Sequence, residues 1–148
     1  MKYIRLKGKK REFIISDPSG GEILVTQNDV RQVQLAKGAI LSGFTALLNK
    51  AGIGMGDLDE VMIAGQFGAH LPGDSLTGVG ILPKEVEDKL TYIGNSSKTG
   101  AYMALMSEKV RQEMTELAGE MEYLELAETV DYERLFSECL IFPGQKEA

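Results

Sequence analysis

The sequence V-M-I-A-G-Q-F-G-A-H-L, residues 61–71, joins a short apolar run to a turn made of small residues. The run at residues 60–64 has the composition of a buried β-strand, and the first glycine follows it directly. Small residues at the carboxyl end of a strand let a ligand approach the backbone closely. The turn is not a dinucleotide-binding fingerprint, because G-x-x-G lacks the third glycine and the first spacing of that motif. From this local pattern, a structural turn and a binding site are equally good interpretations.

A second stretch, Y-I-G-N-S-S-K-T-G-A at residues 92–101, contains the residue types of three known motifs and satisfies none of them. A Walker phosphate loop needs a glycine directly before its lysine, and Ser97 stands before Lys98. The K-T-G tripeptide of serine β-lactamases works with an S-x-x-K motif, which the chain lacks. N-S-S is glycosylated only in secreted proteins, and we recognise no signal peptide. What remains is a strand, a tight turn and a helix capped by Ser97, whose first amides attract anions; the simpler alternative is that the serines only cap the helix.

The composition is that of one compact globular domain. The chain has 148 residues, of which 43% are hydrophobic and 26% charged, which argues against disorder. Its net charge of −6 argues against general nucleic-acid binding. Six of the sixteen basic residues precede the first acid, Glu12, and this basic opening is either a solvated hairpin edge or a partner patch.

The cellular compartment is predicted from what the chain lacks. Its apolar runs are only a handful of residues long, so we expect no membrane span. The only cysteine, Cys139, favours a reducing compartment, and we therefore expect a cytoplasmic protein in which this thiol is a small core residue. One cysteine also excludes a cysteine-ligated iron–sulfur or zinc cluster held by this chain alone. The only histidine, His70, is most simply a surface residue of a loop.

The first half of the chain predicts strands near residues 3–6, 12–15 and 23–25, followed by a long helix. Thr26 is the expected N-cap, with Asp29 in the capping-box position, and the helix should run to about Lys50 and stop at Ala51-Gly52. Apolar residues at helical spacing predict its buried face, which Lys37 interrupts. These residues are Val30, Val33, Ile40, Phe44 and Leu47.

The second half predicts a strand at 91–93, a helix from Ser97 to about Leu117, a strand at 121–126 and a helix at 131–139. Between the strand at 60–64 and the strand at 91–93 we expect an ordered loop at 65–83 and a short helix at 84–89. The buried side of the 97–117 helix should carry Ala101, Leu105, Met114 and Leu117. The alternation of helices and strands indicates an α/β protein.

Taken together, these motifs resemble a known family. The helix carries T-x-x-D-V-R-Q-V-Q-L-A-K-G-A-I, and V-M-I-A-G-Q-F-G, G-I-L-P, Y-I-G-N-S-S-x-x-G-A, Y-L-E-L and I-F-P follow. From about residue 3 to residue 143, the chain closely resembles the C-terminal domain of the reductive activators of corrinoid proteins. Members of that family are cytoplasmic iron–sulfur ATPases of anaerobes that restore the cob(I)alamin state of corrinoid methyl-transfer proteins.

The resemblance implies one half of an actin-like, ribonuclease-H-like ATPase fold, with a mixed sheet and flanking helices. Residues 64–68 would be the adenosine motif, and Gly94, Asn95 and the Gly100-Ala101 pair would pack closely behind it. The long helix would lie between domains, with Lys37 facing the nucleotide cleft. The nucleotide-binding residues implied are Ala64, Gly65, Gln66, Gly68, Asn95 and Lys37.

The chain departs from the family pattern in three ways. The usual A-G-G-F-G has Gln66 in place of its second glycine, while the Asp-Gly phosphate-binding hairpin and the cysteine-rich ferredoxin-like domain are absent. We therefore expect residues 1–148 to be a single C-terminal, ATPase-like domain of a longer protein. ATP would bind partly here, and a 2Fe–2S cluster would belong to the missing N-terminal part. No catalytic residue and no metal ligand is assigned within this chain.

Two function classes follow from the resemblance. The first is the nucleotide-cleft part of an ATP-dependent activator of a corrinoid protein, which would be inactive alone. The second is a non-enzymatic oligomerisation or corrinoid-protein-binding module with a vestigial cleft, which Gln66 favours slightly. The expected partners are a corrinoid protein and a second copy in a homodimer, with no nucleic acid and no membrane.

Overall fold

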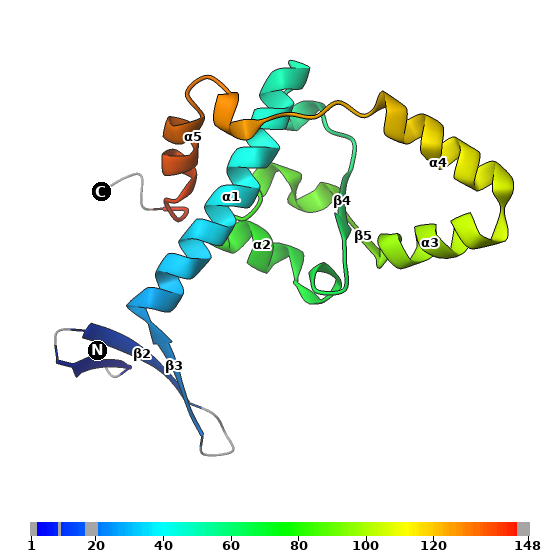
Figure 1. Ribbon diagram of the computed structural model, residues 1–148. Helices are drawn as coiled ribbons and strands as arrows, with labels where there is room; N and C mark the ends of the chain where they lie inside the picture. Colours follow the sequence, from blue (N-terminus) through cyan, green and yellow to red (C-terminus); the bar gives the residue numbers. More distant parts are fainter. Residues whose placement is uncertain (1–2, 9, 17–20, 145–148) are drawn as a thin grey trace.

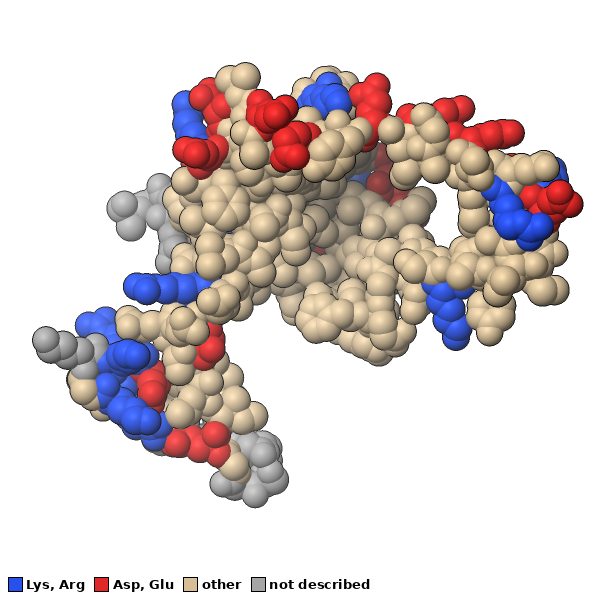
Figure 2. Space-filling model, viewed as in Figure 1, with Lys and Arg blue, Asp and Glu red and all other residues tan. Residues whose placement is uncertain are grey.

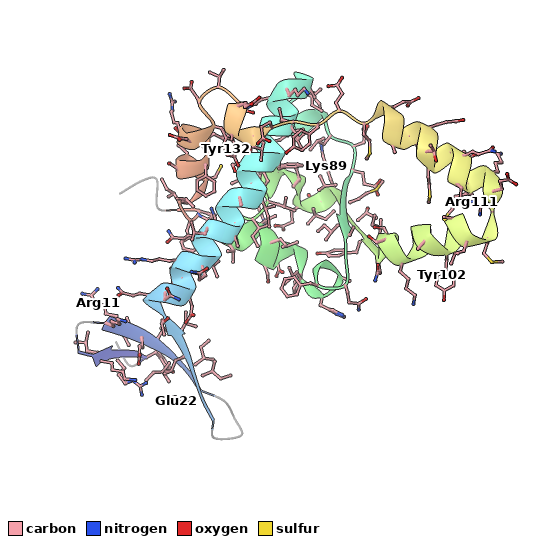
Figure 3. The ribbon with its side chains drawn as sticks, in the orientation of Figure 1. Arg11, Glu22, Lys89, Tyr102, Arg111 and Tyr132 are labelled. Carbon is pink, nitrogen blue, oxygen red and sulfur yellow. The ribbon has the colours of Figure 1, made fainter. Side chains whose placement is uncertain are left out.

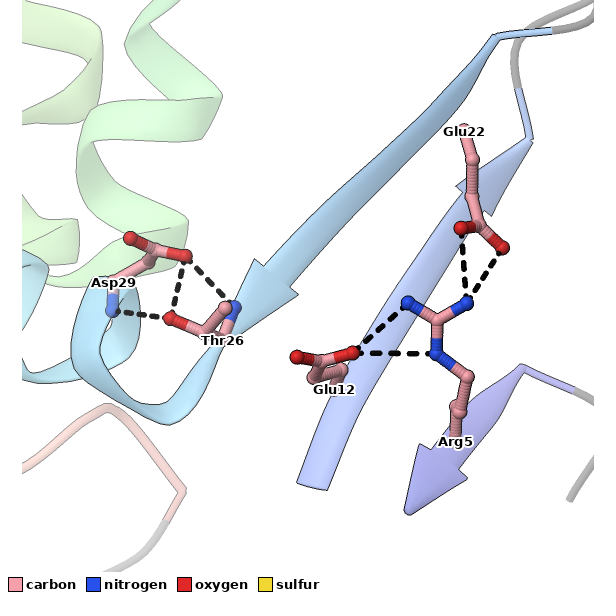
Figure 4. A network of polar contacts seen from close by, with 5 residues as sticks. All are labelled: Arg5, Glu12, Glu22, Thr26 and Asp29. Atoms are coloured by element: carbon pink, nitrogen blue, oxygen red, sulfur yellow. Dashed lines mark hydrogen bonds and ion pairs between the residues drawn. The ribbon is translucent and has the colours of Figure 1, made fainter. Parts of the chain in front are cut away.

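The computed structural model describes residues 3–8, 10–16 and 21–144. Its N-terminal part is a three-stranded antiparallel meander. Its strands are β1 (Ile4–Lys7), β2 (Lys10–Ser16) and β3 (Glu22–Thr26), as predicted. Figure 1 shows that the meander stands apart from the body, at the start of the long helix α1. On one face, the Arg5 guanidinium bridges Glu12 and Glu22, with N–O distances of 2.9 Å to each carboxylate (Figure 4). This charged face is stable in water because its charges are paired across the strands.

The helix α1 (Gln27–Ala51) begins and ends where the sequence predicts. The Thr26 hydroxyl accepts a hydrogen bond from the Asp29 amide at 3.2 Å, and the Asp29 carboxylate accepts one from the Thr26 amide at 2.8 Å (Figure 4). This reciprocal capping box satisfies amide groups that have no partner within the helix. Gly52 ends the helix in the left-handed conformation, with φ of 69°.

The capping box makes part of the stability depend on pH. Hydrogen bonds from the Thr26 backbone and hydroxyl lower the pKa of Asp29 below its ordinary 3.8. A carboxyl group with a lowered folded-state pKa stabilises the fold above its unfolded pKa, and this contribution disappears as the pH falls through the folded value. We therefore expect Asp29→Asn to lower the thermal midpoint at neutral pH but not below the lowered pKa. Parallel melts of both proteins across the acid range measure this; a gap that persisted in strong acid would contradict it.

The predicted buried face of α1 is wrong. Lys37 is 1% exposed, whereas Val30, Val33, Ile40 and Leu47 are exposed. The helix α5 (Tyr132–Cys139) packs instead against a neighbouring side of α1 that carries Gly38, Ser42 and Ala46. That side is small enough for close contact: a Cβ on Gly38 would lie 2.7 Å from the Leu140 side chain. The tyrosine of α5, labelled in Figure 3, reaches Ser42, with 3.0 Å between the Tyr132 and Ser42 oxygens.

The central unit is built on two parallel strands, β4 (Val61–Ala64) and β5 (Leu90–Gly94). Between them lie the 3₁₀ turn η2 (Gly68–His70), the helix α2 (Gly73–Val79) and the 3₁₀ helix η3 (Lys84–Lys89). A further 3₁₀ turn, η1 (Met55–Asp57), precedes β4. Leu76, Leu82 and Val86 form the core cluster, against which half-buried side chains of both strands pack. This unit confirms the predicted α/β arrangement in this part of the chain.

The next segment corrects two predictions. The single helix expected at 97–117 is two helices, α3 (Ser96–Met106) and α4 (Glu108–Glu120), which form a hairpin reaching away from the body (Figure 1). Ser107 divides them because its extended backbone caps α4, its hydroxyl accepting a hydrogen bond from the Val110 amide at 3.3 Å. Leu105 and Leu117, which we expected to be buried, are exposed.

The strand expected at 121–126 is also wrong. These residues run as an irregular connection to the 3₁₀ turn η4 (Leu126–Glu128), and they pair with no strand in the described part of the chain. A strand needs a neighbour with which to exchange hydrogen bonds, and this segment has none among the described residues. Within the described ranges, none of the helices combines the length and the apolar character that crossing a bilayer requires.

Candidate nucleotide site

The ends of β4 and β5 meet at one edge of the two-stranded sheet. Ala64 pairs with Gly94, and the Gly65 amide donates a hydrogen bond to the Gly94 carbonyl at 2.8 Å. The two glycine turns that the sequence singled out are therefore direct neighbours, as predicted. In parallel α/β sheets, ligands bind beyond the carboxyl ends of the strands, which is where these turns lie.

Both glycines adopt a backbone conformation that other residues avoid. Gly65 has φ of 98° and Gly94 has φ of 64°, both in the left-handed region. At each position, no described heavy atom beyond the chain neighbours lies within 4 Å of where a Cβ would stand. The backbone at the strand ends is therefore bare and open, so that a flat ligand group can approach it closely.

Gly68 is required for a different reason. A Cβ there would lie 2.8 Å from the Ile63 Cγ2, so Gly68 lets the turn fold back onto its own strand. The Ala69 amide closes the turn by donating to the Gly65 carbonyl at 3.2 Å. Gln66 is exposed, and Phe67, at 79% exposure, is nearly free of contacts with the described chain. The turn thus exposes the side-chain amide of Gln66 and the aromatic ring of Phe67.

Tyr92 holds the loop after this turn in place, and the sequence analysis missed it. Its hydroxyl donates to the Leu71 carbonyl at 2.6 Å. A Cβ on Gly73 would lie 3.1 Å from the Leu90 side chain, so the loop also packs tightly on β5. The sequence did offer a signal for this role: Tyr92 is an aromatic residue in a strand that lies next to a glycine-rich loop.

Asn95, and not Ser97, is the N-cap of α3. Its side-chain oxygen accepts from the Lys98 amide at 3.0 Å, and its carbonyl accepts from the Thr99 amide at 3.1 Å. The carboxamide oxygen therefore accepts one hydrogen bond within the helix, and the NH₂ group of Asn95 remains to donate to a ligand. Gly100 lies against α4, because its Cβ would be 3.5 Å from the Met114 methyl group. The expectation that the glycine and alanine of residues 100–101 pack behind the 64–68 turn is wrong for this glycine.

Lys37 is set apart from the other predicted site residues. Its ammonium group donates to the carbonyls of Cys139 and Ile141 at 2.5 and 2.9 Å, and it lies 5.7 Å from the centre of the Phe142 ring. Gln34, one turn earlier, donates to the Leu140 carbonyl at 3.3 Å. The Cys139 and Leu140 carbonyls lie at the negative end of α5, which a cation stabilises, and the Ile141 carbonyl follows it. As a nucleotide ligand Lys37 stays a prediction; the structure shows it fastening α1 to α5.

A cavity of about 390 Å³ lies beside Lys37 and is lined by α1, α2 and α5 together with residues 141–144. None of its lining residues belongs to the 64–68 turn, and Asn95 is not among them. Nearby, Glu87 accepts hydrogen bonds from Lys84 and from the buried Thr77, and these bonds lower the pKa of its carboxyl group. This polar network ties η3 to α2, and its charges are already paired.

Metal chemistry has no support in the described residues, among which no group of three or more His, Cys, Asp or Glu side chains is placed to hold an ion. His70 is exposed in η2, as predicted for a surface residue. Cys139 is buried, which confirms the prediction that it is a core residue. The groups exposed beside the strand ends are the side chains of Gln66, Phe67 and Asn95.

The comparison with protein families gives the class of protein: the ASKHA domains, the superfamily that the sequence resemblance implied. The chain belongs to the family described as the C-terminal domain of RACo, the ASKHA domain, whose model matches residues 1–148. A solved structure titled "Reductive activator for corrinoid,iron-sulfur protein" is similar to it, with a TM-score of 0.82 and 32% identity over 96% of this chain.

One curated relative extends the comparison. The chain is 42% identical, over 93 residues, to the "Corrinoid activation enzyme RamQ" of Eubacterium limosum. That match covers 63% of this chain and 16% of the relative, and the structural match covers 23% of the solved chain. The chain therefore spans less than a quarter of the length of either relative, and what those whole proteins do is carried to it only as a proposal.

Proposed function

We propose that this chain is the C-terminal, nucleotide-cleft part of an ATP-dependent reductive activator of a corrinoid protein. The family match over the whole chain and the names of the two relatives support this assignment. The observation that carries the nucleotide part is the pair of left-handed glycines, Gly65 and Gly94, bare at the ends of two parallel strands. An adenine or ribose would lie there, with Gln66, Phe67 and the Asn95 NH₂ group within its surroundings.

The remaining functions would belong to other parts of a longer protein. One cysteine cannot ligate a 2Fe–2S cluster, so the electron carrier does not fit this chain. No Asp-Gly hairpin is present for the phosphates, so the chain supplies the adenosine side of a cleft and no hydrolytic group. The two-stranded sheet is also small for an independent layer, which fits a sheet completed by further strands. A corrinoid protein is the proposed partner of the assembled activator.

A nucleotide titration tests whether this chain supplies only the adenosine side of the nucleotide site. We expect ATP and adenosine to bind this chain weakly and within a few-fold of each other, because only the adenosine side is supplied. Backbone amide NMR shifts should move at residues 64–68 and 94–96 for both ligands. Binding of neither ligand would contradict the proposal, and so would ATP binding more than about tenfold more tightly than adenosine, a difference of 1.4 kcal/mol.

A second candidate is a non-enzymatic oligomerisation or corrinoid-protein-binding module with a vestigial cleft. The exposed apolar side chains of the α3–α4 hairpin, among them Tyr102 and Leu105, favour it because contiguous apolar surface marks interaction sites. Figure 3 shows Tyr102 pointing outward from α3. This module would bind neither ATP nor adenosine, so the same titration separates the two functions.

A further inference from the structure

The turn that follows β4 is tied to β5 at both of its ends. We call residues 65–71 the β4 turn. At its start, the Gly65 amide donates to the Gly94 carbonyl at 2.8 Å. At its end, the Tyr92 hydroxyl donates to the Leu71 carbonyl at 2.6 Å. The exposed side chains in the middle of the turn therefore lie between two hydrogen bonds to the same strand.

The hydrogen bonds within the β4 turn set its shape but not its place on the sheet. The amides of Ala69, His70 and Leu71 donate to carbonyls three or four residues earlier, at 3.1 to 3.2 Å. Residues 61–73 include no Asp, Glu, Lys or Arg, and Figure 2 shows an uncharged surface where Figure 1 places the loop between β4 and α2. The position of the turn therefore depends on hydrogen bonds to β5 and on packing.

Packing places Tyr92 where the chain leaves the β4 turn and enters α2. Leu90 and Tyr92 are two residues apart in β5, so their side chains lie on the same face of the sheet. A Cβ on Gly73 would lie 3.1 Å from the Leu90 side chain and 3.8 Å from the Tyr92 hydroxyl. Leu71 packs half-buried against the core cluster. The side chain of Leu71 is thus held by apolar contacts, and its carbonyl is held by Tyr92.

We propose that Tyr92 is a positioning residue of the nucleotide site, which fixes the β4 turn through Leu71 so that Gln66 and Phe67 are oriented before a ligand arrives. This inference rests on the proposed nucleotide function, and it adds to that function a residue outside the turn. A turn that is already ordered binds a ligand more tightly, because less conformational entropy is lost on binding.

Tyr92→Phe tests the hydrogen bond by itself, because it removes the hydroxyl and keeps the ring. Without ligand, we expect the NMR order parameters of the amides at residues 66–71 to fall below the value of about 0.85 that is typical of rigid backbone. We expect the affinity for adenosine to fall about fivefold, equivalent to about 1 kcal/mol, because the turn must then be ordered on binding. Circular dichroism shows whether the variant folds.

Tyr132→Phe is the matched control, because it also removes one tyrosine hydroxyl from a hydrogen bond between two elements. The Tyr132 hydroxyl lies 3.0 Å from the Ser42 hydroxyl, between α5 and α1. We expect this variant to lower the thermal midpoint at least as much as Tyr92→Phe does. It should nevertheless leave the order parameters of the β4 turn and the affinity for adenosine unchanged, which distinguishes positioning from a general loss of stability.

The order parameters and the affinity together decide whether Tyr92 positions the turn. Unchanged order parameters in Tyr92→Phe would overturn the proposal, and a loss of affinity without a loss of order would make Tyr92 a direct contact of the ligand instead. An equal loss of affinity in Tyr132→Phe would also overturn it. If the wild-type chain bound no adenosine, the nucleotide function would fail and the positioning role with it. If the wild-type chain and Tyr92→Phe bound adenosine equally, only the positioning role would fail.

Discussion

Lys37→Met is expected to lower the free energy of unfolding by about 3 kcal/mol, since it leaves buried carbonyl acceptors without their charged donor. Lys37 is 1% exposed and its ammonium group donates to the Cys139 and Ile141 carbonyls, whereas methionine fills the same volume without replacing these hydrogen bonds. For a chain of this size, the thermal midpoint should fall by about 10 °C. Chemical denaturation followed by circular dichroism measures both quantities.

Lys50→Met provides the control, because it removes a lysine from the same helix whose ion pair is exposed. Its ammonium group pairs with Glu122 at 3.0 Å, and a surface pair of this kind contributes about 0–1 kcal/mol. If Lys37→Met and Lys50→Met proved equally mild, the α1–α5 fastening would not be a main source of stability.

Gly65→Val is expected to abolish adenosine binding, with a loss of affinity of tenfold or more, equivalent to about 1.4 kcal/mol or more. Valine fills the open space over the strand ends, and φ of 98° strains a β-branched residue. The backbone that the ligand would approach is then covered and displaced. The NMR titration that tests the wild-type chain measures the loss.

The matched control is Gly52→Val, at the end of α1. Gly52 also has a left-handed backbone, with φ of 69°, and also has open space at its Cβ position. Both variants lose stability through the same strain, so a difference in ligand binding isolates the position. Equal binding by both variants would remove the 64–68 turn from the nucleotide proposal.

The sequence predicted correctly those elements whose position depends on residues that are close together in the chain. The capping box of Thr26 and Asp29, the Gly52 stop and the three meander strands were all confirmed. The turns at Gly65 and Gly94 were also located correctly, because glycine is the residue that tolerates a left-handed backbone at a strand end. Each of these features depends on neighbours within a few residues of the chain.

The errors occurred where the outcome depended on distant parts of the chain. The periodicity of α1 identified a helix correctly but assigned its buried side to the apolar residues, whereas α5 packs against its small residues. Ser107 split a helix that periodicity alone would continue, and the 121–126 segment found no strand partner among the described residues. The apolar periodicity of a sequence indicates that a helix is amphipathic, but contacts with other elements determine which of its sides is buried.

By itself, the sequence determined the α/β class, the boundaries of α1, which its capping box and Gly52 set, and membership of the family. These follow from backbone preferences and from motifs that are read residue by residue. Only the tertiary structure decided that Lys37 is buried against α5 and that Ile40 is left exposed. The physical reason is that burial and site assembly depend on contacts between residues up to about a hundred positions apart, such as Lys37 and Cys139, which are 102 apart.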